Sequence, residues 1–88
     1  MKLKYEFIIR EVGDRYVAVA VGDNAEEFHG IIRMNKSGKI MMELLKSEIT
    51  EAGLLTKLME QYEGTEEFFK GEIDKFVGGL RNAGVIVD

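Results

Sequence analysis

The first part of the chain alternates apolar and polar positions with a period of two, which predicts strands. Segments 5–10 and 16–21 both follow this period, at which side chains of a strand share one face. Between them, Gly13-Asp14 is a two-residue hairpin signal, because both residue types tolerate the positive φ angles of such turns. After a polar connection, a third predicted strand runs from Phe28 to Met34. We assign Phe28, Gly30, Ile32 and Met34 to its core face, and His29, Ile31 and Arg33 to the opposite face.

At Asn35 the pattern changes to helical spacing, and three helices are predicted from there on. Asn35, Thr50 and Thr65 are suitable N-cap residues for them. The first helix is expected to end near Lys46, the second at Glu63-Gly64 and the third at Asn82-Ala83-Gly84. The predicted apolar faces are Ile40, Met41, Leu44 and Leu45, then Leu54, Leu55, Leu58, Met59 and Tyr62, then Phe69, Ile73, Phe76, Val77 and Leu80.

These elements predict an α+β fold, with a three-stranded antiparallel sheet followed by three helices in a winged helix-turn-helix arrangement. The apolar tail 85–87 is expected to add a strand or to pack on the core. A length of 88 residues indicates one domain, spanning residues 1–88. A sheet of three strands has two edges, which must be protected or used. The third strand is our candidate for use, because it has one charge, a glycine and no proline.

Composition limits the possible settings and partners of this domain. The chain has no cysteine, so it has no disulfide framework and no thiolate metal site. Its N-terminal segment has only a three-residue apolar run, too short for a secretory signal or a spanning helix, so we expect a cytosolic protein with no membrane partner. The net charge is −4 and the basic residues are scattered, which makes nucleic acid an unlikely partner.

The residues that carry catalysis are scarce. His29 is the only histidine, so any nucleophile and base pair would depend on it alone. No metal-ligand spacing occurs near it, and Gly78-Gly79 lies in a helical pattern instead of a phosphate-binding turn. The carboxylate pairs Glu26-Glu27 and Glu66-Glu67 are interpreted as solvated charge. We therefore predict no enzyme activity, no metal and no cofactor.

Gly78 and Gly79 lie inside the third helix, where each glycine costs about 1 kcal/mol relative to alanine. Helical geometry places Gly79 in line with Phe68, Glu72 and Lys75, beside the core face. One interpretation is close packing, or sequence drift at a tolerant position. The other is that this line forms one wall of a groove with room for a bound peptide.

Several segments, in order, resemble the PqqD-like family, named for the D component of pyrroloquinoline-quinone biosynthesis. They are Phe7-Ile-Ile-Arg-Glu-Val-Gly13, Val19-Ala-Val-Gly22, Phe28-His-Gly-Ile-Ile-Arg-Met-Asn-Lys-Ser-Gly38, Met41-Met-Glu-Leu-Leu45, Thr50, Tyr62 and Phe76-Val-Gly-Gly-Leu-Arg-Asn-Ala-Gly84. The resemblance covers nearly the whole chain. Met42, Ala20 and His29 depart from the family pattern, in which tryptophan, proline and asparagine are common at these positions.

The resemblance implies a non-catalytic peptide chaperone. PqqD-like proteins hold the leader of a ribosomally made precursor peptide and present it to a modifying enzyme, often a radical S-adenosylmethionine enzyme. An extended peptide would add to the free edge of the third strand, with side chains entering a groove against the third helix. The implied peptide-binding residues are Phe28, His29, Gly30, Ile31, Ile32, Arg33 and Met34 on the strand, and Phe68, Glu72, Lys75, Phe76 and Gly79 on the helix.

Two alternatives remain from the residues alone. A winged helix can read DNA, but it needs basic side chains on its recognition helix. The third helix instead carries Glu66, Glu67, Glu72 and Asp74 against Lys70, Lys75 and Arg81. The second alternative is an interaction subunit that dimerises through its exposed sheet edge.

Overall fold

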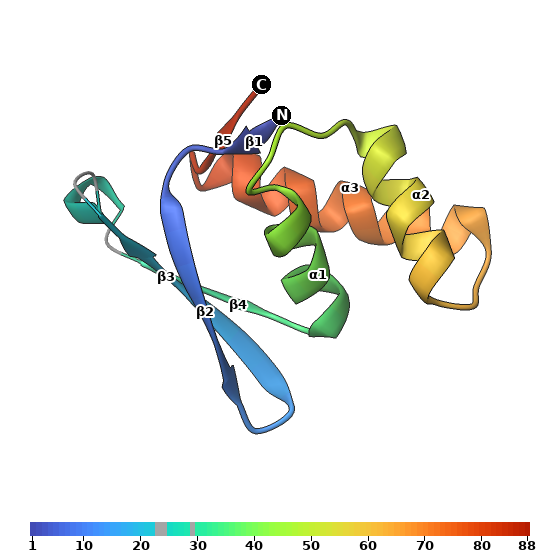
Figure 1. The fold of residues 1–88 in the computed structure, drawn as a ribbon, viewed down its shortest axis with the longest axis horizontal. Helices are drawn as coiled ribbons and strands as arrows, with labels where there is room; N and C mark the ends of the chain where they lie inside the picture. Colours follow the sequence, from blue (N-terminus) through green and yellow to red (C-terminus); the bar gives the residue numbers. More distant parts are fainter. Residues whose placement is uncertain (23–24, 29) are drawn as a thin grey trace.

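The computed structural model describes residues 1–22, 25–28 and 30–88 (Figure 1). Its elements are β1 (Lys2–Leu3), β2 (Glu6–Val12), β3 (Arg15–Val21), the 3₁₀ helix η1 (Ala25–Glu27), β4 (Ile31–Met34), α1 (Lys36–Leu44), α2 (Glu51–Gln61), α3 (Glu66–Asn82) and β5 (Ile86–Val87). Strands β2, β3 and β4 form an antiparallel sheet in that order. The predicted α+β class, with three strands before three helices, is confirmed.

Local signals account for the turns and helix starts. The β2–β3 turn is Gly13-Asp14, with only Gly13 at positive φ (+64°), as in a type II′ turn. Each helix begins after its predicted cap: the Asn35 side chain accepts from the Gly38 amide at 2.9 Å, and the Thr50 hydroxyl accepts from the Gly53 amide at 3.0 Å. Thr65 caps α3 in the same way. These caps confirm all three predicted helix starts.

Two parts of the strand prediction need correction. Strand β4 is four residues long and begins at Ile31, so the predicted strand from Phe28 was too long. Gly30 is exposed, and it is not a core residue. The second correction concerns β1, which was not predicted; it pairs antiparallel with β5, so the apolar tail does add a strand, in a separate two-stranded sheet. Figure 1 shows the two chain ends side by side at this pairing.

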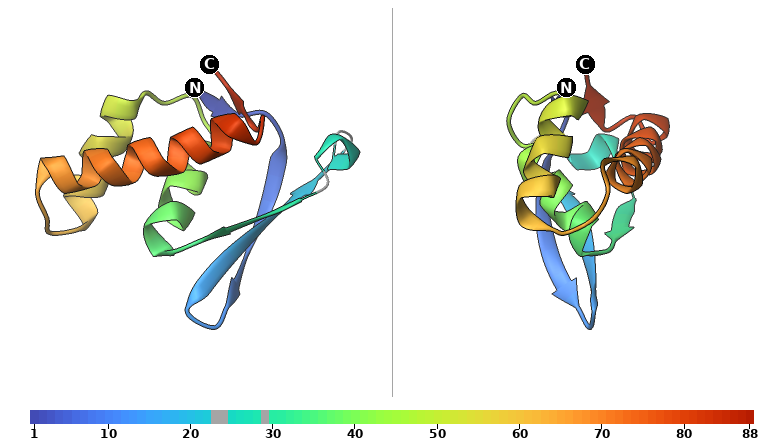
Figure 2. Two further views of the ribbon diagram at one scale, coloured as in Figure 1. Left: turned by 180° about the vertical axis from the view of Figure 1, so that it is seen from behind. Right: turned by 90° about the vertical axis from the view of Figure 1, so that its right-hand side faces the viewer.

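One hydrophobic core joins the three-stranded sheet to the helices. Figure 2 shows these two parts of the fold from two further directions. Its buried residues are Met1, Phe7, Ala18, Met34, Met41, Met42, Leu45, Leu54, Leu58, Phe69, Ile73, Val77, Leu80 and Val85. Most of the predicted apolar helix positions are confirmed. Met59 is not, because it is 44% exposed on α2.

The sheet register decides which strand faces point toward this core. Ala18 of β3 is fully buried and lies between Ile9 of β2 and Ile32 of β4. The alternate positions of β3, which carry its valines, therefore point to the other side of the sheet. Val19 is accordingly 40% exposed, although valine is the more apolar residue. The small Ala18 and Ala20 face the core instead.

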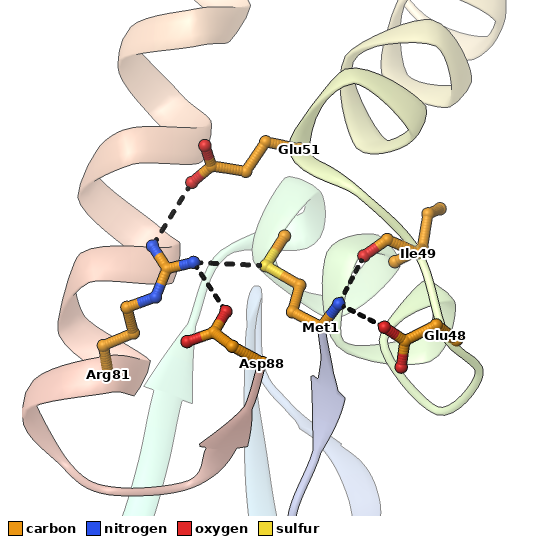
Figure 3. A network of polar contacts seen from close by, with 6 residues as sticks. All are labelled: Met1, Glu48, Ile49, Glu51, Arg81 and Asp88. Carbon is orange, nitrogen blue, oxygen red and sulfur yellow. Dashed lines mark hydrogen bonds and ion pairs between the residues drawn. The ribbon is translucent and has the colours of Figure 1, made fainter.

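A polar network ties the two chain ends to the helices (Figure 3). The Met1 ammonium group donates to Glu48 Oε1 at 2.7 Å and to the Ile49 carbonyl at 3.1 Å. Arg81 on α3 contacts Asp88 Oδ1 at 2.9 Å and Glu51 Oε1 at 3.4 Å. The pKa of the Asp88 carboxyl is lowered, chiefly by its hydrogen bond with Arg81. The network holds the β1–β5 sheet against α2 and α3.

Candidate functional site

A groove of about 470 Å³ lies between strand β4 and helix α3. Its strand side carries Ile31, Ile32, Arg33 and Met34, and Phe28 lines it just before the strand. Glu72, Lys75, Phe76 and Gly79 contribute the helix side. Nine of the twelve residues predicted as a peptide site therefore line one groove.

Three predicted residues fall elsewhere. His29 lies outside the described residues. Gly30 is exposed and does not line the groove, because the chain reaches strand conformation only at Ile31. Phe68 is also absent from the groove lining, and its ring packs edge-on against Phe69 with centroids 5.5 Å apart.

The distance along α3 explains the position of Phe68. It precedes Gly79 by eleven residues, or about 16 Å of helix. The groove-lining residues of α3 and its C-cap run from Glu72 to Ala83, which is the same length of helix, so the groove lies nearer the C-terminus of α3 and leaves out its first turn. In Figure 1, α3 extends past the end of β4 toward the α2–α3 connection. The predicted helical line of residues was correct in direction, but it began one turn too early and left out Ala83.

The groove is also lined by residues that were not predicted to belong to the peptide site. They are Arg15, Asn35, Ser37, Met41, Leu80 and Ala83. Ala83 continues the line of Gly79 by one turn, a signal available from helical spacing. Arg15 carried no such signal, because it comes from the start of β3 and reaches the groove only through the sheet register.

Two glycines shape the groove in opposite ways. A Cβ atom at Gly79 would meet no heavy atom within 4 Å, so close packing does not explain this glycine. The same holds for Gly78, which does not line the groove. At Gly38 a Cβ would lie 2.8 Å from Met34 Cβ and 3.1 Å from Phe76 Cε1. Gly38 therefore lets α1 approach the groove residues Met34 and Phe76 closely, whereas Gly79 leaves space open.

The groove is locally basic in a chain of net charge −4. Arg15, Arg33 and Lys75 line it, against one carboxylate, Glu72. Within the described part of the chain, none of the ion pairs involves these four side chains. Their charges are available to a bound molecule, and the balance favours one with acidic side chains.

The backbone of β4 adds hydrogen-bonding capacity to these side chains. One edge of β4 pairs with β3, from Val19↔Ile31 to Tyr16↔Met34. No described strand pairs with its other edge. A free edge presents N–H and C=O groups in a row, which an extended chain can pair with. The arrangement combines a pairing edge with side-chain pockets.

Neither a metal-ligand cluster nor a membrane-spanning helix is found in the described residues. No group of three or more His, Cys, Asp or Glu side chains there is placed to hold a metal ion. None of the helices described is both long enough and apolar enough to cross a membrane.

Most of the chain matches a known protein family. Residues 16–86 match the family model described as Coenzyme PQQ synthesis protein D (PqqD). The chain belongs to the PqqD family. The match includes both sides of the groove and all three helices, and it confirms the resemblance read from the sequence.

Structural similarity extends this relationship at the level of the fold. The solved structure of TbiB1 in complex with the TbiA(beta) leader peptide has a TM-score of 0.73 to this PqqD family member, with 100% of each chain covered. The two sequences are 13% identical, so the likeness shows a shared fold. No curated protein matches the sequence significantly.

Proposed function

We propose that this PqqD family member is a non-catalytic chaperone for the leader of a ribosomally made precursor peptide. Residues 1–88 act in this proposal as a single peptide-binding domain. The observation that carries the proposal is the free edge of β4 facing a groove against α3. A related fold, that of TbiB1, is known in complex with a leader peptide, which supports the same role here.

The leader binds as an additional strand. Its backbone pairs with the β4 edge, and every second side chain points into the groove. Phe28, Ile32 and Phe76 supply apolar contact there, and all three are only half-buried without a partner. Gly79 leaves room for an apolar side chain of the leader, and Arg33 and Lys75 pair with its carboxylates.

The bound leader is presented to a separate modifying enzyme, of the radical S-adenosylmethionine class, in the cytoplasm. Family membership supports an accessory role of this kind. The chain itself supplies binding and positioning, and the enzyme with its own cofactor supplies the chemistry.

The test is a titration of the isotope-labelled chain with the leader of the precursor peptide encoded beside its gene. We expect amide shifts concentrated in β4 and α3, saturating at micromolar concentrations or tighter. A scrambled peptide of the same composition is the control for non-specific charge attraction. Absence of saturable shifts with every neighbouring precursor would overturn the proposal.

The two alternative functions predict other results. A DNA-binding regulator would be retained on duplex DNA at near-physiological salt, with shifts on α3 but not on β4. An edge-to-edge dimer would show concentration-dependent shifts in β4 without any peptide. The enzyme class is tested separately, by asking whether modification of the precursor by the neighbouring radical enzyme depends on this chain.

A further inference from the structure

The outer face of the three-stranded sheet is unusually apolar for a surface without a covering layer. The register aligns Ile8 of β2, Val19 of β3 and Ile31 of β4 in one row across all three strands. These side chains are 44%, 40% and 51% exposed, and Val12 on the same face is 60% exposed. They make up four of the seven large exposed apolar side chains in the described residues. Such concentration marks an interaction surface more often than scattered apolar residues do.

The charges on this face differ in sign from those of the chain as a whole. Its outward positions carry Arg10, Arg15 and Arg33 against the single carboxylate of Glu6. All three arginines are exposed, and among the described residues they take part in no ion pair. The face is therefore an apolar row with a basic rim, in a chain of net charge −4.

This combination favours a partner of opposite charge over a second copy of the chain. A second copy would bring two faces of the same net positive charge together, and like charges across an interface are destabilising. A protein surface that is apolar at its centre and carries Asp and Glu at its rim complements the face in both respects.

We propose that the outer face of β2, β3 and β4 is the docking surface for the peptide-modifying enzyme, through an apolar, acid-rimmed patch on that enzyme. The inference rests on the proposed function, because it supposes that a modifying enzyme must meet the loaded chain. In this arrangement the leader binds in the groove and at the free edge of β4, and the enzyme binds to the outer face of the sheet.

Geometry links the two partners. Arg15, Ile31 and Arg33 belong to the outer face and also line the groove. A leader paired with β4 extends the sheet by one strand, and every second leader side chain then joins the outer face. From strand spacing and length, the present face has a projected area of roughly 300 Å². The leader strand enlarges this area, so the enzyme should bind the loaded chain more tightly than the empty one.

The test measures enzyme and leader binding separately, using the modifying enzyme and the precursor leader encoded beside this gene. Replacing Ile8 and Val19 together by threonine removes apolar contact while keeping the β-branched shape that strands favour. We expect this double variant to bind the enzyme about tenfold more weakly or worse, with leader affinity unchanged. The control is Val87→Thr, at an exposed valine on β5 away from this face. Thermal unfolding verifies that each variant is folded.

A second variant tests the charge. Arg10→Glu is expected to weaken enzyme binding about tenfold at low salt and less at high salt, because exposed charges are screened. Lys57→Glu, an exposed charge reversal on α2 away from the sheet, is the matched control.

The outcomes separate this inference from the proposed function. The proposed docking surface is wrong if both face variants bind the enzyme as the wild type does, or if they alter self-association instead. Neither result would affect the proposal of leader binding. If the wild-type chain does not bind the leader, the proposed function is wrong. Enzyme binding to the chain without leader would still test whether the outer face is a docking surface.

Discussion

The space above Gly79 is the feature of the groove that a single substitution can fill. A Cβ at Gly79 or at Gly78 meets no heavy atom within 4 Å, but only Gly79 lines the groove. The two neighbours therefore form a matched pair in the same helix. We consider alanine at each position for stability and leucine at each position for peptide binding.

Both alanine variants should stabilise the chain. Glycine in a helix interior costs about 1 kcal/mol relative to alanine, and neither new methyl group meets an obstacle. For a domain of this size, 1 kcal/mol raises Tm by roughly 4–8 °C. Circular dichroism melts of the two variants measure this directly.

Peptide binding should separate the two positions. Leucine at Gly79 would occupy the space that we assign to an apolar leader side chain, whose burial is worth about 1.5–3 kcal/mol. Displacing that side chain raises Kd about 10- to 100-fold. Leucine at Gly78 points away from the groove and should leave Kd unchanged. Fluorescence anisotropy with a labelled leader measures both.

Two results would refute this reasoning. If Gly79→Leu and Gly78→Leu bind the leader equally well, the leader does not pass over Gly79. If Gly79→Ala is less stable than the wild type, the space above it is not open. The first result bears on the position of the peptide, and the second on the structure of the groove.

Three further predictions follow from other contacts. Gly38→Ala should lower the free energy of unfolding by about 1 kcal/mol despite the better helix propensity of alanine, because its Cβ would lie 2.8 Å from Met34 Cβ; an increase in denaturant stability would contradict the close contact. Tyr62→Phe should raise the free energy of unfolding by about 1 kcal/mol, since the buried Tyr62 hydroxyl has no hydrogen-bond partner among the described residues; a loss of similar size would mean that it is bonded. Arg81→Met should return the lowered pKa of Asp88 toward its ordinary value in an NMR titration. In the wild type, the stability from this pair is present above the ordinary pKa of Asp88 and is lost as pH falls through the lowered one; an unchanged pKa in the variant would rule out Arg81 as the cause.

The helices show what short-range signals can determine. Asn35, Thr50 and Thr65 each accept a hydrogen bond from the amide three residues later, a contact made entirely within one turn. Gly13 likewise sets the β2–β3 turn through its own φ angle. Such interactions depend on neighbours in sequence, so the chain alone determined where these elements begin and turn. Helical spacing likewise put Glu72, Lys75 and Gly79 of α3 on one line, whereas Phe76 was assigned to the site by the resemblance to the PqqD-like family.

The tertiary structure decided how far each pattern extends and what it faces. Whether Phe68 lines the groove depends on where β4 ends beside α3, and the pairing of β1 with β5 joins opposite ends of the chain. The row of Ile8, Val19 and Ile31 exists only because two strand registers align it. Alternation in sequence separates two faces of a strand but does not say which face the helices cover. That choice belongs to packing between distant segments, and it turned the valines of β3 outward.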